Sequence, residues 1–171
     1  MTSLRVTLFA IFLSLAVTSL VLITSAAEPG QRIELSVAGA GPREIEETTE
    51  KAIVRDYAVA WKALATALNE NRVQALDAGF IGDARNKLGN RIGEQKRSGL
   101  RTRYVDRGHK LEVLFYSPEG SAMQLRDAAT LEMQVLDGDQ VVNSQQLTQN
   151  YLVVMTVGED RWKVRVLQEV P

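Results

Sequence analysis

Hydrophobic and polar positions change their spacing partway along this chain. Between Ile53 and Leu68 the apolar residues recur every three or four positions, so they fall on one face of a helix. Counted from Pro42, this helix has roughly seven turns. From Ser121 to Leu136 apolar and polar residues alternate, which is the pattern of a strand buried on one face. The chain is therefore predicted to form helices first and strands afterwards, as in an α+β domain.

The first helix is predicted to begin at Pro42, because proline suits a first helical turn and acidic residues follow it. The chain is expected to break or bend tightly at Asn69-Glu70-Asn71. Two shorter helical patterns come next, one ending near Gly79 or Gly82 and the other at Gly99. Together these helices offer apolar faces that can cover a sheet.

The second half of the chain predicts one curved antiparallel sheet of about four strands. The predicted strands are Lys110–Tyr116, Ser121–Leu136, Val141–Val157 and Asp160–Val170. Short connections such as Asp137-Gly138 join them, and tight turns of this kind pair neighbouring strands in an antiparallel meander. The helices are expected to pack on one face of this sheet.

An uncharged segment from Val6 to Ala27 precedes the helices and strands. A transmembrane helix needs about 20 apolar residues, so this segment is long enough to be one. Ser25-Ala26-Ala27 also has the small residues that precede a signal-peptidase cleavage site. Two interpretations stay open, a retained single-span anchor and a signal cleaved after Ala27. Both carry the rest of the chain across the membrane, and Arg5 favours an N-terminus in the cytoplasm.

These patterns divide the chain into three predicted parts. Residues 1–27 are the membrane anchor or signal, residues 28–42 are a linker, and residues 43–171 are a periplasmic or otherwise extracytoplasmic domain. The linker contains the breaker residues Pro29-Gly30 and Gly39–Pro42. Within it, alternation of Ile33, Leu35 and Val37 also admits a short edge strand.

Composition narrows the chemistry. The chain has no cysteine, one histidine and a formal net charge of −1. Thiol catalysis, disulfides and cysteine-ligated metals are thereby excluded, and a histidine-based metal site is not expected. No phosphate-binding glycine motif is present either. The sequence predicts neither a metal nor an organic cofactor.

Basic residues are concentrated between residues 85 and 110. We interpret this stretch either as a solvated helix face and loop or as a contact surface for an acidic partner or lipid headgroups. Nucleic acid is not an expected partner, because aromatic residues for base stacking are sparse here. The residues of the predicted contact surface are Arg85, Lys87, Arg91, Lys96, Arg97, Arg101, Arg103 and Arg107.

One residue breaks the alternation of the long second strand. Asp127 falls on its apolar side, where a buried carboxylate needs partners or a raised pKa, and such a group can act as a general base. A bulge near Asp127 that turns the side chain outward is the alternative interpretation. Asp127 and His109 are the only catalytic candidates. A ligand pocket between helix and sheet would be lined by Tyr57, Trp61, Met133 and Asp127, although Tyr57 and Trp61 also suit plain core packing.

Helices followed by a curved meander ending in a Trp-Lys-Val strand resemble the NTF2-like (SnoaL-like, cystatin-superfamily) cone-shaped α+β domain. The resemblance covers residues 43–170, and the motifs that carry it are Tyr151-Leu-Val-Val-Met and Arg161-Trp162-Lys163-Val164. It implies a fold in which membrane-tethered relatives serve as extracytoplasmic parts of secretion, division or translocation assemblies. Enzymatic relatives use an acid or histidine deep in the cone, and only Asp127 and His109 are of those types here.

Two functions are consistent with the sequence. The first is a non-catalytic, membrane-anchored accessory or assembly subunit of a secretory, respiratory or photosynthetic complex, which makes protein contacts through its extracytoplasmic domain. The second is a small-ligand-binding protein, or an isomerase or hydratase type of enzyme, that uses the interior of the cone.

Overall fold

The computed structural model of the chain describes residues 32–171. The predicted membrane segment Val6–Ala27 lies outside these residues. Among the helices that are described, none is both long and apolar enough to cross a membrane.

Three helices precede the long strands. α1 spans Glu47–Glu70, a 3-10 helix η1 spans Val73–Ala78, and α2 spans Gly82–Arg97. α1 begins after Glu46, later than the predicted start at Pro42, with Glu47 and Glu50 in its first turn where the helix dipole favours anions. It ends within the predicted break Asn69–Asn71, where the left-handed conformation of Asn71 closes the last turn.

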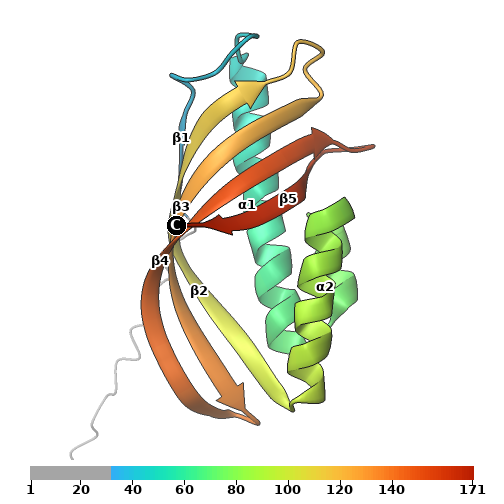
Figure 1. The fold of residues 1–171 in the computed structure, drawn as a ribbon, viewed down its shortest axis with the longest axis vertical. Coiled ribbons are helices and arrows are strands. Elements are labelled where there is room, and N and C mark those ends of the chain that lie inside the picture. Colours follow the sequence, from blue (N-terminus) through green and yellow to red (C-terminus); the bar gives the residue numbers. More distant parts are fainter. Residues whose placement is uncertain (1–31) are drawn as a thin grey trace, which may run out of the picture.

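The strands form one sheet in the order β1-β2-β3-β4-β5 (Figure 1). Their bounds are Ile33–Ser36, Leu100–Tyr116, Ala122–Asp137, Gln140–Val157 and Trp162–Val170. β2 to β5 pair in the predicted antiparallel meander, and β1 pairs parallel to β2. The structure is therefore α+β, with helices on a curved sheet.

Three features of the sheet correct the sequence prediction. The sheet has five strands rather than about four, because the short edge strand that the alternation of Ile33, Leu35 and Val37 admitted is formed as β1. β1 is parallel to β2, so the sheet is not wholly antiparallel. β2 begins at Leu100 rather than Lys110, so residues 100–109, which were expected to be loop, belong to the strand. Arg101 and Arg103 alternate there with more buried residues, as strand residues do.

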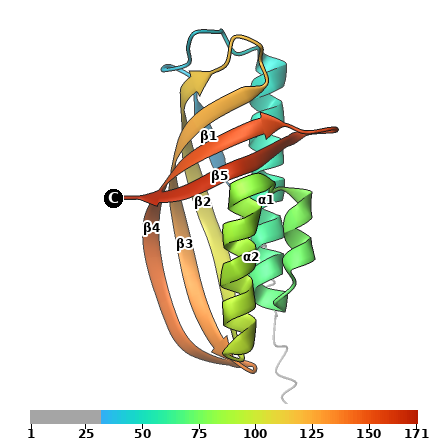
Figure 2. The same ribbon diagram turned by 45° about the vertical axis from the view of Figure 1, so that its right-hand side comes forward.

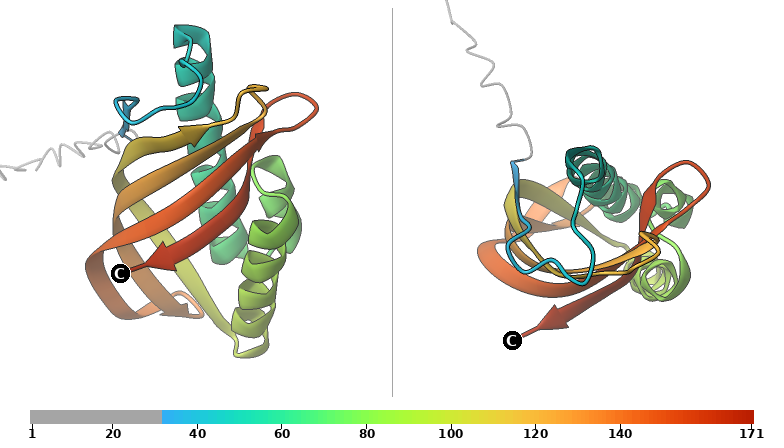
Figure 3. Two further views of the ribbon diagram at one scale, coloured as in Figure 1. Left: turned by 45° about the horizontal axis from the view of Figure 1, so that its top comes forward. Right: turned by 90° about the horizontal axis from the view of Figure 1, so that it is seen from above.

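The helices lie along the concave side of the sheet (Figures 2 and 3). Large apolar side chains fill the core between these two layers. Fully buried examples are Ile53, Leu68, Phe80, Leu125 and Met155. The apolar positions that predicted the α1 face and the β3 face thus meet in one core.

Gly79, just after η1, lets the chain pass close to α1. A Cβ atom at Gly79 would lie 2.3 Å from the Cα atom of Ala60, which is backbone and has little room to move. We expect Gly79→Ala to lower the free energy of unfolding by about 1–3 kcal/mol, as overpacking in a core does. Urea unfolding measures this loss.

Gly93 provides the control for that substitution. It lies inside α2, and a Cβ atom there would meet nothing within 4 Å. Gly93→Ala should therefore raise stability by about 0.5–1 kcal/mol. Equal effects from the two substitutions would show that the contact between Gly79 and Ala60 is not tight.

Candidate functional site

Asp127 lies at the centre of a buried polar cluster on the concave face of the sheet. Its neighbours across the strands are Leu111 and Tyr151, and the pairing runs without a break at this position. The alternative in which a bulge turns Asp127 outward is therefore wrong. The Asp127 side chain is completely buried, and its Oδ2 atom accepts hydrogen bonds from Tyr57 Oη at 2.7 Å and His109 Nδ1 at 2.8 Å.

A β-bulge brings a second carboxylate to His109. Asp106 and His109 are three residues apart, so strict alternation would place them on opposite faces of β2. Arg107 is an extra residue between two consecutive pairs with β3, and it shifts the phase of the strand. Asp106 therefore faces the same side as His109, with 2.9 Å between Asp106 Oδ2 and His109 Nε2. Its other oxygen accepts the backbone N–H of Gly108 at 2.9 Å.

Both ring nitrogens of His109 thus face carboxylate oxygens, an arrangement in which the imidazole donates twice and carries a positive charge. Burial alone would lower the pKa of His109. The hydrogen bonds and charges of Asp106 and Asp127 outweigh burial and raise this pKa to about 9. His109 is consequently an imidazolium at neutral pH, held between two acids.

Aromatic rings close the cluster from the helix side. The Trp61 ring lies 4.5 Å from the His109 ring and 5.7 Å from the Tyr151 ring, between ring centroids. Tyr57 meets His109 edge-on at 5.5 Å. Burial, together with the charge of Asp127, raises the pKa of Tyr57 well above its usual value, so its hydroxyl stays protonated and continues to donate. Rings over an imidazolium add cation–π attraction.

The cluster is poorly arranged for acid–base catalysis in this state. A general base needs a free lone pair within reach of a substrate, and neither nitrogen of His109 has one. Tyr57 and Asp127 expose no surface, and His109 exposes 2%. One polar atom is unused: Asp127 Oδ1 is buried and accepts no hydrogen bond from the described residues.

One surface depression borders the cluster at His109, and the others lie away from it. One of about 430 Å³ lies beside the start of β5 and is lined by α1 and by Asp160 and Arg161 of the β4–β5 turn. Another, of about 120 Å³, lies at the bulge beside β1 and is lined in part by Gly108, His109 and Thr130. Neither is lined by Tyr57, Trp61 or Asp127.

The structure separates Met133 from the other predicted pocket residues. Tyr57, Trp61 and Asp127 lie together, but Met133 is six residues further along β3, roughly 20 Å away along the strand. Met133 is half-buried and pairs with Tyr104 and Gln145. A pocket containing all four side chains is not formed.

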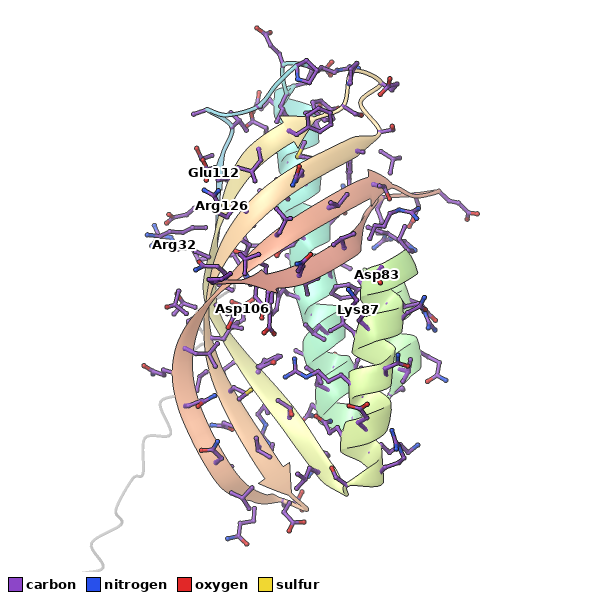
Figure 4. All side chains as sticks on the ribbon, viewed as in Figure 1. Arg32, Asp83, Lys87, Asp106, Glu112 and Arg126 are labelled. Carbon is purple, nitrogen blue, oxygen red and sulfur yellow. The ribbon has the colours of Figure 1, made fainter. Side chains whose placement is uncertain are left out.

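The predicted basic surface divides between α2 and β2. Four of its residues form ion pairs: Arg85 with Asp77, Lys87 with Asp83 (Figure 4), Arg101 with Asp139, and Arg107 with Glu132. Within residues 32–171 the remaining four have no carboxylate partner. These are Arg91, Lys96, Arg97 and Arg103, and we refer to them as the basic set.

Sequence reasoning missed Asp56, a buried acid in α1 whose side chain is 1% exposed. Its carboxylate pairs with Arg55 at 2.8 and 3.1 Å and accepts the backbone N–H of Trp162 at 2.9 Å. It therefore fastens α1 to the start of β5. The available signal was its spacing, because Asp56 lies three residues after Ile53 on the apolar face of the helix.

Helices on the concave face of a five-stranded, strongly curved sheet define the NTF2-like class of α+β folds. Among solved structures, the chain is similar to the intermembrane space region of the chloroplast protein ARC6. The TM-score is 0.62 at 16% identity, over 75% of this chain and 98% of that one.

Two further structures align less closely. A scytalone dehydratase-like protein from Novosphingobium aromaticivorans gives a TM-score of 0.49 at 12% identity, over 71% of this chain and 83% of that one. ActVI-ORFA from Streptomyces coelicolor gives 0.49 at 11% identity, over 70% of this chain and 95% of that one. No protein-family model matches the chain, and no curated protein matches it in sequence.

Proposed function

We propose that this protein is a non-catalytic accessory or assembly subunit of a membrane protein complex. The segment Val6–Ala27 tethers it, and the NTF2-like domain makes protein contacts on the extracytoplasmic side. The complex is secretory, respiratory or photosynthetic. The observation that carries the proposal is the closed cluster, in which both ring nitrogens of His109 are hydrogen-bonded, one to Asp106 and one to Asp127.

The closed cluster favours a structural, scaffolding role for the domain, because its side chains hold α1 against the sheet. Tyr57 and Trp61 come from the helix, and His109 and Asp127 come from adjacent strands. Buried charges that are paired in this way rigidify a domain and specify one arrangement of its elements. A rigid domain with its interior filled offers its surface, rather than a pocket, to other molecules.

The similarity to ARC6 supports a membrane-associated role. The similar region of ARC6 is an intermembrane space region, so this fold is used there beside membranes. The basic set supports a partner with acidic groups, because its four cations are not neutralised by carboxylates of residues 32–171.

Extraction in mild detergent followed by native sizing tests the proposal. The tagged full chain should elute in a complex with co-purifying proteins. Arg97→Glu combined with Arg103→Glu should reduce this co-purification if the basic set contacts the partner. Arg126→Glu is the matched control, because Arg126 is an exposed arginine paired with Glu112 on the outer face of the sheet (Figure 4).

A chain that elutes alone under every extraction condition would contradict the assembly role. N-terminal sequencing of the mature protein separates the two interpretations of the first segment. Retained residues before Glu28 identify an anchor, and a mature start at Glu28 identifies a signal cleaved after Ala27.

The unused Oδ1 atom of Asp127 favours a second candidate, a small-ligand binder or an isomerase or hydratase type of enzyme that opens the cone. In that role Asp127 would accept a hydrogen bond or a proton from the ligand. Asp127→Asn should then abolish any ligand or turnover signal. A signal that survives this substitution would exclude Asp127 from such a site.

A further inference from the structure

The first part of β4 is an open edge of the sheet. β5 pairs with β4 only from Asn150 to Val157, whereas β3 pairs with β4 along its whole length (Figure 1). Among residues 32–171, Gln140–Gln149 therefore has a strand neighbour on one side alone. Every second backbone N–H and C=O group of such an edge points away from its sheet and can pair with another strand.

This edge lacks most features that keep sheet edges from pairing. Natural edges are blunted by lysine, proline, inward-pointing charges or a covering element. Residues 140–149 read QVVNSQQLTQ and contain neither a charged residue nor a proline, in a chain that is 24% charged. The one such feature is a bulge at Val142, which leaves Asn143–Gln149 as a regular run.

The side chains around this edge indicate which kind of strand can pair with it. On β3 and β4 the neighbouring inward positions are Met133, Val135, Gln145 and Leu147, all uncharged. On this inward face a charged partner strand gains nothing, while a second copy of the same strand meets no repulsion. Val141 and Val142, which are 43% and 53% exposed, lie at the end of this edge, beyond its regular run.

We propose that two copies of this chain associate through antiparallel pairing of β4 with β4 about a two-fold axis. Full overlap of the regular run Asn143–Gln149 puts Gln146 opposite its own counterpart, and Ser144 opposite Thr148 of the other copy. Such pairing is isologous, so it closes as a dimer. It joins two five-stranded sheets into one, and it goes beyond the proposed accessory role because it does not depend on any other partner.

Disulfide crosslinking through a single introduced cysteine tests the pairing. No other thiol can form a disulfide, since the chain has no cysteine of its own. Directly opposed residues of antiparallel strands have Cα atoms about 4.5–5.5 Å apart, within the range of a disulfide. Gln146→Cys in the purified full chain should therefore form a covalent dimer under mild oxidation. Thr148→Cys lies on the same edge and is also exposed, but its counterpart would be about 13 Å away, so it should not crosslink with itself.

Charge substitutions on the same edge provide a second test. In the Gln146→Cys background, Ser144→Lys with Thr148→Lys places like charges opposite each other twice, and crosslinking should fall by about fivefold. Ser144→Glu with Thr148→Lys instead places opposite charges together and should preserve it. Both positions are exposed, so the fold is retained in each variant.

Three results would overturn the proposal: no crosslink from Gln146→Cys, equal crosslinking from Thr148→Cys, or equal crosslinking in both charge variants. None of these results depends on whether other proteins co-purify with the chain, so failure of the dimer and failure of the accessory role are distinguishable.

Discussion

Replacing Asp127 with asparagine is expected to lower the free energy of unfolding by about 3 kcal/mol. The substitution keeps the shape of the side chain and removes its charge, so no cavity forms. What is lost is the completely buried anion that accepts from Tyr57 at 2.7 Å and His109 at 2.8 Å. Removing one partner of a buried pair leaves the other charge uncompensated, and Asp106 keeps the loss at the low end of the usual range.

Glu112→Gln is the matched control for Asp127→Asn. Glu112 and Arg126 form the neighbouring rung of the β2–β3 pair, on the outer face, where both side chains are about half exposed. An exposed ion pair contributes about 0–1 kcal/mol, so this acid-to-amide change should be almost neutral. Urea unfolding at neutral pH compares the two variants. Similar losses in both would show that the inner cluster does not stabilise the domain.

The stability of the protein is expected to fall as the pH rises from about 6.5 to 9. The pKa of His109 is about 9 in the folded protein and 6.5 in its ordinary environment, so folding favours the protonated form. The resulting stabilisation is complete below pH 6.5 and is lost as the pH rises through 9. From these two values the loss is about 3 kcal/mol, as an order of magnitude.

His109→Asn isolates this contribution, because His109 is the only histidine of the chain. The variant should be less stable at pH 6.5 and show a flatter dependence of stability on pH between 6.5 and 9. Burial raises the pKa values of Tyr57 and Tyr151, so these hydroxyls do not ionise within that interval. A wild-type stability that increases over the same interval would contradict the ion-paired state of His109.

The alternating pattern was sufficient to predict the central strand and to place Asp127 on its buried side. It could not predict the partners of Asp127, because they depend on a local break of the alternation. Arg107 bulges out of β2 and brings Asp106 to the side of His109. Nothing in the local sequence distinguishes this extra residue from a regular one, although Gly108 beside it has a φ of 145° that favours glycine.

β1 and the early part of β2 were harder to predict for a different reason. Ile33–Ser36 is so short that its alternation only admitted a strand, and it is held by pairing with residues 109–112, far away in the chain. In residues 100–106 arginines occupy the outer face, and Thr102 and Tyr104, rather than aliphatic residues, occupy the inner face. Tertiary pairing rather than local hydrophobicity forms these strands.

Helical spacing alone did place Tyr57 and Trp61 on the buried face of α1, and both are buried. The same spacing contained Asp56, yet an acid is overlooked when only apolar positions are counted. Met133 shares its face with Asp127, but period-two reasoning says nothing of distance along the strand. The sequence therefore predicts which face a residue occupies more reliably than which residues gather into a site.

Proton NMR of the His109 ring, followed from pH 5 to 10.5, tests most directly the claim that the interior is a closed ion-paired cluster. The single histidine gives one resolvable set of ring signals. We predict a midpoint near pH 9, with both ring N–H protons protected from exchange at neutral pH. A midpoint at or below 6.5, or rapid exchange of both protons, would contradict the account.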